Sequence, residues 1–267
     1  MNTKRLLRLF IFLLFITLLI MLLLKVISWY STKRVRDFPE IEKSGIMNVV
    51  VEYNSVDFHV VGDSAGGVQY DLCKYIAQRS GLEVRFFLEN DLEIAIQKLE
   101  SNEFDIISQN IPITNDNKRF LAFTVPTAQN KQVLVQRKRN ESDSIPFVAN
   151  QLDLAKKTIY VTKNSSAILR LNNLSEEIAE AIYIKEISGY TSEQLIYMVD
   201  KKEIDYAVVD KEISLKNTEL FPDLDFTTDI SFTQLQAWAL RKTSPVLLDS
   251  LNVWITAFKQ KKEAALF

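Results

Sequence analysis

The chain has 267 residues, of which 47% are apolar and 25% are charged, a composition typical of a folded globular protein and not of a disordered one. Seven of the 32 basic residues precede Asp37, the first acidic residue, which leaves 25 basic and 34 acidic groups in the rest of the chain. A body with a net charge of about −9 has no electrostatic reason to bind nucleic acid.

The N-terminal segment is strongly apolar. Residues 9–24 are an unbroken run of apolar residues and threonine, and after Lys25 the run continues through Tyr30. A run of this length can cross the hydrocarbon core of a bilayer, which needs roughly 20 residues. No small-residue cleavage pair follows it, so residues 1–30 are predicted to be an uncleaved single-pass anchor, with Trp29 and Tyr30 at the membrane interface. A cleaved signal peptide is the alternative.

The orientation of this anchor depends on the basic residues that flank it. These are Lys4, Arg5 and Arg8 before the run, and Lys33, Arg34 and Arg36 after it. The first group favours a cytoplasmic N-terminus, whereas the second group weakens that bias. We expect the body to lie in the periplasm or outside the cell, tethered to the cell membrane.

Beyond a charged linker at residues 31–44, strand-like and helical runs alternate. Strands are predicted over residues 47–53, 83–87 and 104–108, and helices over residues 70–77 and 91–99. This alternation indicates a largely parallel sheet that is covered on both faces. Cys73 lies within the first helical run and is expected to be a buried structural thiol. Because it is the sole cysteine, it excludes an internal disulfide and a cysteine-based zinc cluster.

Residues 182–210 repeat the pattern of residues 82–110 one hundred positions later. Each unit reads as a strand, a helix, an acidic turn and a second strand; in the later unit these fall at 182–187, 191–199, 200–203 and 204–209. Four of the 29 positions are identical: Glu93, Ile96, Glu103 and Asp105 recur as Glu193, Ile196, Glu203 and Asp205. The repeat predicts two lobes of shared architecture, and it leaves ancestral duplication open.

The remaining runs complete the two lobes. A strand at 158–161 and a helix at 165–174 precede the second unit, residues 132–136 read as a connecting strand, and polar residues 138–144 mark a boundary. A short strand at 237–240 is followed by a helix that Pro245 opens. The predicted division is lobe 1 at residues 45–137 and 229–267 and lobe 2 at residues 138–228.

The sequence lacks the motifs that several kinds of cofactor and metal chemistry require. The chain has six glycines and neither a dinucleotide fingerprint nor a phosphate-binding loop, so no nucleotide cofactor is predicted. His59 is the only histidine, which argues against a catalytic triad or a multi-histidine metal site.

Ligands of open parallel sheets bind outside the carboxyl ends of the strands, so the residues after each strand are the candidates. They are Glu52, Tyr53, Asn54 and Phe58 in the first group, Gln109, Asn110, Ile111 and Thr114 in the second, and Asn164, Ser165, Ser166 and Asp210 in lobe 2. Ser165 and Ser166 would open a helix whose N–H groups favour a carboxylate, and Asp210 could accept from an ammonium group. The alternatives are ordinary helix capping for the serines, a solvated acid for Asp210, and core packing for Tyr53 and Phe58.

Segments 49–54, 67–77, 104–107, 113–123 and 132–137 resemble, in order and spacing, the family 3 extracellular solute-binding proteins. In lobe 2, residues 160–166, 204–210, 231–234 and 237–239 resemble the binding domain of membrane-bound lytic murein transglycosylase F. The resemblance implies an α/β fold of the two-lobed periplasmic-binding-protein type (type II), with hinge strands near residues 132–136 and 226–230. It also implies that Asp210 holds a ligand amine while Thr114, Ser165 and Ser166 help to hold its carboxylate.

Two departures from the resemblance matter. Asn117 stands where amino-acid binders usually carry an arginine that pairs with the ligand carboxylate, and only Lys118 or Arg119 could substitute. The chain also ends at Phe267, where the transglycosylases continue into a lysozyme-like domain, so no glycan cleavage is expected.

The resulting prediction is a membrane-tethered, noncatalytic sensor or binding module that clamps an amino acid, a small peptide or a peptidoglycan stem fragment, partnered by a permease or a cell-wall enzyme. The alternatives are a transporter substrate-binding protein, a dehydratase-like enzyme that uses Glu52 or Asp210 as an acid, and a scaffold with a degenerate cleft.

Overall fold

The computed structural model describes residues 3–32, 36–140 and 145–264, and it divides the chain into one unit that ends at Arg36 and another that begins at Asp37. The first unit holds helix α1 (Thr3–Thr32). Within the described residues, no helix combines the length and hydropathy that crossing a membrane requires. The anchor over residues 1–30 therefore stays a prediction. The side chains of Trp29 and Tyr30, and residues 33–35 of the predicted linker, lie outside the described part.

The second unit begins with a helix where the sequence predicted a linker. Helix α2 (Phe38–Ser44) buries Ile41 against α9 (Pro245–Ala264), while its charged residues face outward. Asp37 caps both helices: its carboxylate accepts from the backbone N of Phe38 at 2.8 Å and from those of Val246 and Leu247 at 3.1 and 2.8 Å. The charged composition was misleading because two apolar residues, Ile41 and Phe38, are enough to pack so short a helix against α9.

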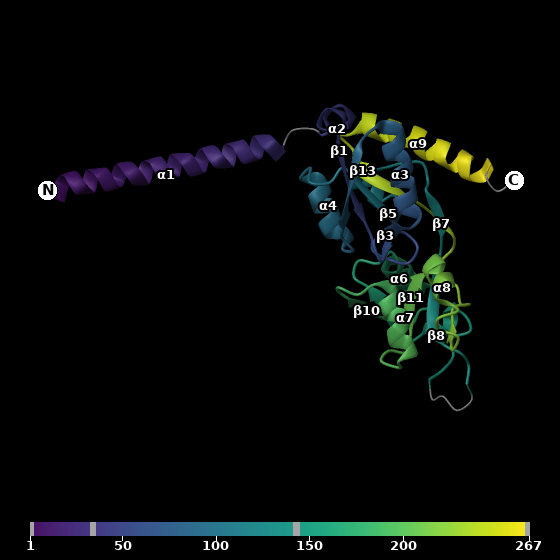
Figure 1. The fold of residues 1–267 in the computed structure, drawn as a ribbon. Coiled ribbons are helices and arrows are strands. Elements are labelled where there is room, and N and C mark those ends of the chain that lie inside the picture. Colours follow the sequence, from purple (N-terminus) through teal and green to yellow (C-terminus); the bar gives the residue numbers. More distant parts are fainter. Residues whose placement is uncertain (1–2, 33–35, 141–144, 265–267) are drawn as a thin grey trace. The chain divides into compact units, whose positions relative to one another are not determined.

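The first sheet has the strand order β4-β1-β5-β13-β6, with β7 also paired to β13 (Figure 1). Its strands are β1 (Ile46–Val51), β4 (Glu83–Leu88), β5 (Ile106–Pro112), β6 (Leu121–Phe123), β7 (Ala128–Asn130) and β13 (Gln234–Arg241). Strands β4, β1 and β5 are parallel, whereas β13 runs antiparallel to β5, β6 and β7. The sheet therefore contains both parallel and antiparallel pairs, because β13 runs opposite to the strands beside it.

Helices cover both faces of this sheet. Helices α3 (Val68–Ser80) and α9 pack against Val49, Val51 and Trp238, whereas α4 (Leu92–Glu100) packs against Val50 on the other face. Cys73 is fully buried within α3, and burial raises the pKa of its thiol, which confirms the expected inert role. A hairpin of β2 (His59–Val61) and β3 (Ser64–Gly66) and the short helix α5 (Asn117–Phe120) complete the lobe.

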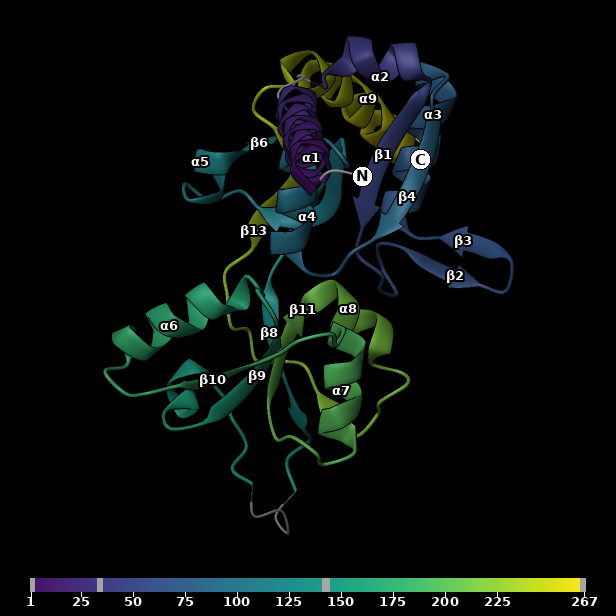
Figure 2. The same ribbon diagram turned by 90° about the vertical axis from the view of Figure 1, so that its left-hand side faces the viewer.

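The second sheet has the order β10-β9-β11-β8-β12. Its strands are β8 (Gln132–Arg137), β9 (Thr158–Thr162), β10 (Tyr183–Ile187), β11 (Ala207–Asp210) and β12 (Leu224–Asp225). Helix α6 (Ala167–Glu177) lies on one face, whereas α7 (Ser192–Asp200) and α8 (Lys211–Asn217) lie on the other (Figure 2), and a short 3-10 helix (Gln151–Leu154) packs beside α6.

The boundary between the lobes differs from the prediction. Strand β8 was assigned to lobe 1, but it pairs with β11 and β12 in the second sheet. The chain therefore crosses from one lobe to the other near Lys131 and returns after Asp229, which forms a bridge to Val133. Of the polar residues 138–144, Lys138 bonds to the Asp223 carbonyl within lobe 2, and residues 141–144 lie outside the described part.

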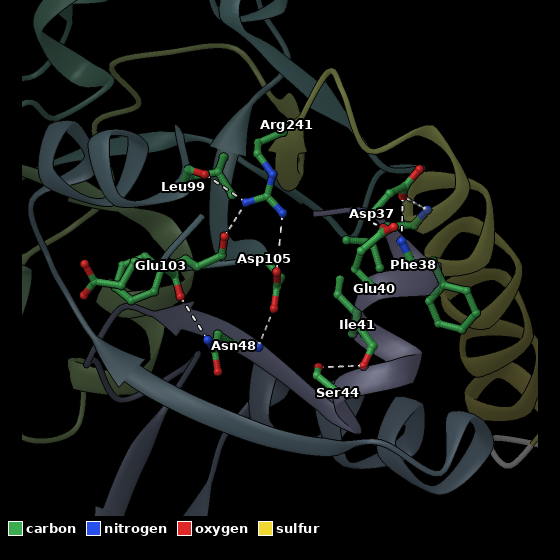
Figure 3. A network of polar contacts seen from close by, with 12 residues as sticks. Asp37, Phe38, Glu40, Ile41, Ser44, Asn48, Leu99, Glu103, Asp105 and Arg241 are labelled. Atoms are coloured by element: carbon green, nitrogen blue, oxygen red, sulfur yellow. Dashed lines mark hydrogen bonds and ion pairs between the residues drawn. The ribbon is translucent and has the colours of Figure 1, made fainter. Parts of the chain in front are cut away.

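The two repeated units are more alike in structural detail than their low sequence identity would suggest. After α4 and α7, Asn102 and Lys202 both adopt a left-handed conformation with φ 63°. In each lobe an arginine of the adjacent antiparallel strand then bridges the end of the helix and an aspartate. Arg241 Nη1 donates to the carbonyls of Leu99 and Phe104 and Nη2 lies 3.3 Å from Asp105 (Figure 3); Arg137 makes the same contacts to Val199, Ile204 and Asp205. The predicted common architecture is confirmed.

Candidate ligand-binding site

A cavity of about 100 Å³ lies where the carboxyl ends of the parallel strands of both sheets meet. Lobe 1 contributes Glu52, Asn90, Leu92 and residues 109–112, and lobe 2 contributes Gln132, residues 162–166, Ser192, residues 208–210 and Ile213. Most of these residues lie at or just after the carboxyl ends of β1, β5, β9 and β11, where the rule for open parallel sheets places a ligand.

Direct contacts between the lobes surround this cavity. Asp91, which caps α4, lies 2.7 Å from the Lys163 ammonium and accepts from Asn164 Nδ2 at 3.0 Å. The Lys163 ammonium holds the pKa of Asp91 below its usual range. On the pseudo-equivalent side, Glu193 in the first turn of α7 accepts from the backbone N of Ser55 at 2.8 Å. The N-terminal turns of the two repeated helices thus each reach across to the opposite lobe.

Asp210 ends β11 and precedes α8, but its side chain does not cap that helix. Burial, and then the charges of Asp57 and Glu212, raise its pKa to about 7, while the amides of Gln236 and Asn130 oppose the shift. This environment does not fit a solvated loop acid. Asp210 lines the cavity, where it could accept hydrogen bonds from a ligand amine.

Glu52 follows β1 and lines the cavity opposite Asp210 of the other lobe. Burial raises its pKa to about 8, and the charges of Asp57, Asp210 and Glu193 add to the shift. The sequence placed Glu52 among the candidates after the first strand and offered it as an acid, but nothing local to it signals the acidic residues that the other lobe brings close.

Asp57 lies behind the cavity and is 6% exposed. Its carboxylate accepts from the side-chain amides of Asn54 at 2.9 Å, Gln69 at 3.0 Å and Asn110 at 2.8 Å. Burial raises its pKa, and the three amides oppose the shift. Trp238 Nε1 in turn donates to Gln69 Oε1 at 2.6 Å. This network could not be predicted from the sequence, because its members are dispersed along the chain.

The two serines lie at the cavity, at the start of α6. Ser166 is the N-cap residue, yet its hydroxyl makes no capping bond and accepts from Gln132 Nε2 at 2.7 Å. Ser165 Oγ accepts from the backbone N of Ala167 at 3.2 Å. Ser165 therefore acts as an ordinary helix-capping residue, whereas the Ser166 hydroxyl links α6 to the hinge strand β8.

Of the other predicted binding residues, Gln109 lines the cavity, whereas Thr114 and Asn117 line a neighbouring hollow of about 250 Å³. The Asn117 amide donates to the Pro112 carbonyl at 2.9 Å. Lys118 and Arg119 are exposed and line neither space, so they do not replace the missing arginine.

The residues after β1 separate into two environments. Tyr53 is 42% exposed and lines neither space. Phe58 is 6% exposed, with its ring 5.2 Å from that of Phe86 and 6.1 Å from that of Tyr70, so it is a core residue and its prediction as a ligand contact is wrong. The chain turns back at Asn54, whose backbone N donates to the Phe58 carbonyl, and this turn carries the ring inward. Asn54 itself is 2% exposed and lies in the Asp57 network.

A larger hollow of about 460 Å³ lies at the opposite end of lobe 2, beside residues 136–140, 145–147, Asp205 and Tyr206. Its residues precede β11 instead of following it, and the charged groups with raised pKa values lie elsewhere. We therefore place the binding site at the smaller cavity between the lobes.

Two α/β lobes joined by crossing strands, with a polar cavity between their strand ends, define a solute-binding protein of the two-lobed type. The chain belongs to the bacterial extracellular solute-binding proteins, family 3, whose family model matches residues 47–266.

Two relatives are membrane-bound lytic murein transglycosylases F. The protein of Desulfosudis oleivorans is 24% identical over 236 residues, covering 88% of this chain and 50% of the relative. That of Photobacterium profundum is 24% identical over 256 residues, covering 94% and 48%. The chain thus spans about half the length of these relatives.

Solved structures share the fold. A mutant of ArgBP from T. maritima has a TM-score of 0.71 at 23% identity, with 85% of this chain and 95% of that one covered. AbpA, an amino acid ABC transporter substrate-binding protein from Streptococcus pneumoniae bound to L-arginine, has a TM-score of 0.70 at 18% identity, with 85% and 94% covered.

Proposed function

We propose that this chain is a noncatalytic binding module that clamps a small solute with an amino group between its lobes: an amino acid, a short peptide or a peptidoglycan stem fragment. The observation that carries the proposal is the position of Asp210, a carboxylate with no capping partner at the end of β11, in a cavity that both lobes line. In this proposal residues 1–30 hold the body at the outer side of the cell membrane, next to a permease or a cell-wall enzyme.

Lobe closure is the proposed mechanism. A ligand enters between the open lobes, its amine meets Asp210, and its remaining polar groups meet Gln109, Ser165 and Ser166. The contact of Asp91 with Lys163 and that of Glu193 with Ser55 then hold the lobes together. The crossings near Lys131 and Asp229 act as the hinge, because they are the two points at which the chain passes between the sheets.

A substrate-binding protein of a transporter is a second candidate, which the likeness in fold to AbpA favours. An enzymatic role is a third. Glu52, with a pKa of about 8, meets the requirement for a general acid near neutral pH. Product formation from a bound ligand, monitored by mass spectrometry, would identify the enzyme; recovery of the ligand unchanged supports the binding module.

Thermal unfolding of the full chain against a panel of amino acids, dipeptides and muropeptides tests the proposal. A ligand present at 100 times its dissociation constant should stabilise the folded state by about 2.7 kcal/mol, a shift in Tm of roughly 5 to 10 °C. Asp210→Asn should abolish the shift, because it removes the charge that faces the amine. Asp223→Asn, at an exposed site distant from the cavity, is the control. No shift across the panel would favour a scaffold, and turnover of purified peptidoglycan would contradict the noncatalytic role.

Membrane attachment needs a separate test. We expect the chain to sediment with membranes after a high-salt wash, and a reporter fused after Phe267 to be active outside the cytoplasm. A reporter that is active only in the cytoplasm would contradict the proposed location.

A further inference from the structure

We propose that the cavity selects a ligand with two amino or guanidino groups and no carboxylate, that is, an organic dication and not a zwitterionic amino acid. This inference rests on the proposed clamping of a solute with an amino group, and it replaces the zwitterionic ligands named there with dications.

The first support is the excess of acidic groups. Glu52 and Asp210 line the cavity from opposite lobes, and Asp57, Glu193 and Glu212 lie close enough to act on one or both of them. Among the described residues that line the cavity, the sole basic side chain is Lys163, and Asp91 binds it at 2.7 Å. The two lining carboxylates therefore lack a positive partner within the cavity.

The second support is a set of buried acceptors that lack a donor. Gln132 is 3% exposed and lines the cavity; its Nε2 donates to Ser166, but its Oε1 has no partner. Gln236 is 2% exposed, its amide contacts Asp210, and its Oε1 also has no partner. Glu193 Oε2 is the third such atom. Of these three residues, Gln132 lines the cavity. A buried acceptor without a donor is costly, so its Oε1 favours a ligand nitrogen that carries hydrogen over a quaternary ammonium group.

The third support is the lack of an unpaired basic side chain for a carboxylate among the described residues that line the two spaces. Asn117 stands in place of the expected arginine, and its amide is already bonded to the Pro112 carbonyl. Arg170, the basic residue among those that line the neighbouring hollow, is bound by Glu177 at 2.6 Å. A ligand carboxylate would instead lie near Asp210, the more ionised of the two acids at pH 7.5, where like charges repel it.

A metal ion fits these residues less well than an organic dication does. Within the described part of the chain, no group of three or more His, Cys, Asp or Glu side chains could hold one. The two lining carboxylates lie on different lobes, an arrangement suited to a linear molecule with a charge at each end.

Calorimetric titration of the full chain with four probes tests the proposal. Cadaverine has two primary amines, its fully N-methylated analogue has the same charge without N–H donors, pentylamine has one amine, and L-lysine adds a carboxylate. We expect cadaverine to bind at least about tenfold more tightly than each of the other three, because each lacks one of the required features or adds an excluded one.

Glu52→Gln should reduce the preference for cadaverine over pentylamine to about threefold or less, since it removes one of the two charges. Asp223→Asn is the matched control and should leave the preference unchanged. Because the pKa values of Glu52 and Asp210 are raised, a dication should release protons on binding, so titrations at pH 7.5 in buffers of different ionisation enthalpy should yield different apparent heats. The charged groups around these two acids are Asp57, Glu193, Glu212 and the Asp91–Lys163 pair.

The possible outcomes separate this inference from the proposed function. If glutamine, leucine or L-lysine binds at least as tightly as cadaverine, the dication inference is wrong and the binding function stands. If neither diamines nor zwitterions bind, both are wrong.

Discussion

At the scale of single residues, the paired arginines allow a controlled comparison. Asp105 is fully buried beside Arg241, whereas the side chain of Asp205 beside Arg137 is 44% exposed. Arg241→Met should lower the free energy of unfolding by about 3 to 5 kcal/mol, because it leaves a buried charge without its partner. Arg137→Met should cost distinctly less, since water can solvate Asp205. Urea denaturation measures both, and equal losses would contradict the role given to burial.

Glu52 should make the stability of the ligand-free protein depend on pH. Its folded pKa of about 8 lies above the ordinary value of 4.5, so its contribution to stability is fully present below pH 4.5 and is lost as the pH rises through 8. Glu52→Gln should remove this loss of stability. Between pH 5 and pH 9 the free energy of unfolding of the variant should therefore rise by roughly 2 kcal/mol relative to that of the unchanged protein, a figure already reduced for solvent screening in the cavity. Denaturation at several pH values checks it; parallel pH profiles for the two proteins would contradict it.

The sequence predicted which residues lie at the strand ends better than it predicted their hydrogen-bond partners. The rule for strand ends located Gln109, Ser165, Ser166 and Asp210 at the cavity, because it needs only the alternation of strands and helices. It misassigned Phe58, because the turn after β1 reverses the chain. The Asp57 network could not be predicted, since its hydrogen bonds join residues as far apart as Gln69 and Trp238.

At the scale of elements, Asp37 connects the first and last helices of the body. Asp37→Ala removes acceptors from the starts of both α2 and α9, and it should lower the free energy of unfolding by about 2 kcal/mol or more. Asp37→Asn keeps one acceptor oxygen and should lower the free energy of unfolding by about half as much. Chemical denaturation of both variants is the measurement, and an undiminished stability of Asp37→Ala would contradict the double cap.

Most elements of the body were predictable because hydrophobic periodicity is local. Strands β1, β4, β9 and β10 and helices α3, α4, α7 and α9 lie close to the predicted ranges. The membership of β8 was not predictable, since pairing with β11 or β5 depends on long-range contacts and not on the strand's own residues. Short elements such as α2, α8 and the β2–β3 hairpin give too few periods to be recognised.

At the scale of the whole body, the contact of Asp91 with Lys163 should shift the balance between closed and open lobes. Lys163→Met removes the ion pair but leaves Asp91 to cap α4, so the ligand-free protein should open and its radius of gyration should increase. Small-angle X-ray scattering measures this change, and Lys216→Met, at an exposed site on α8, is the control of equal charge. High salt should have a similar effect on the unchanged protein, because this pair is partly exposed.

The central position of β13 in the first sheet has a consequence for biosynthesis. The ribosome releases residues 132–229, and with them all strands of the second sheet, before residues 234–241 emerge. A nascent chain halted between these points would carry a finished second lobe beside a first sheet whose β5 edge is still bare. That edge is a surface for chaperones to shield, so lobe 1, although translated first, is the last to mature.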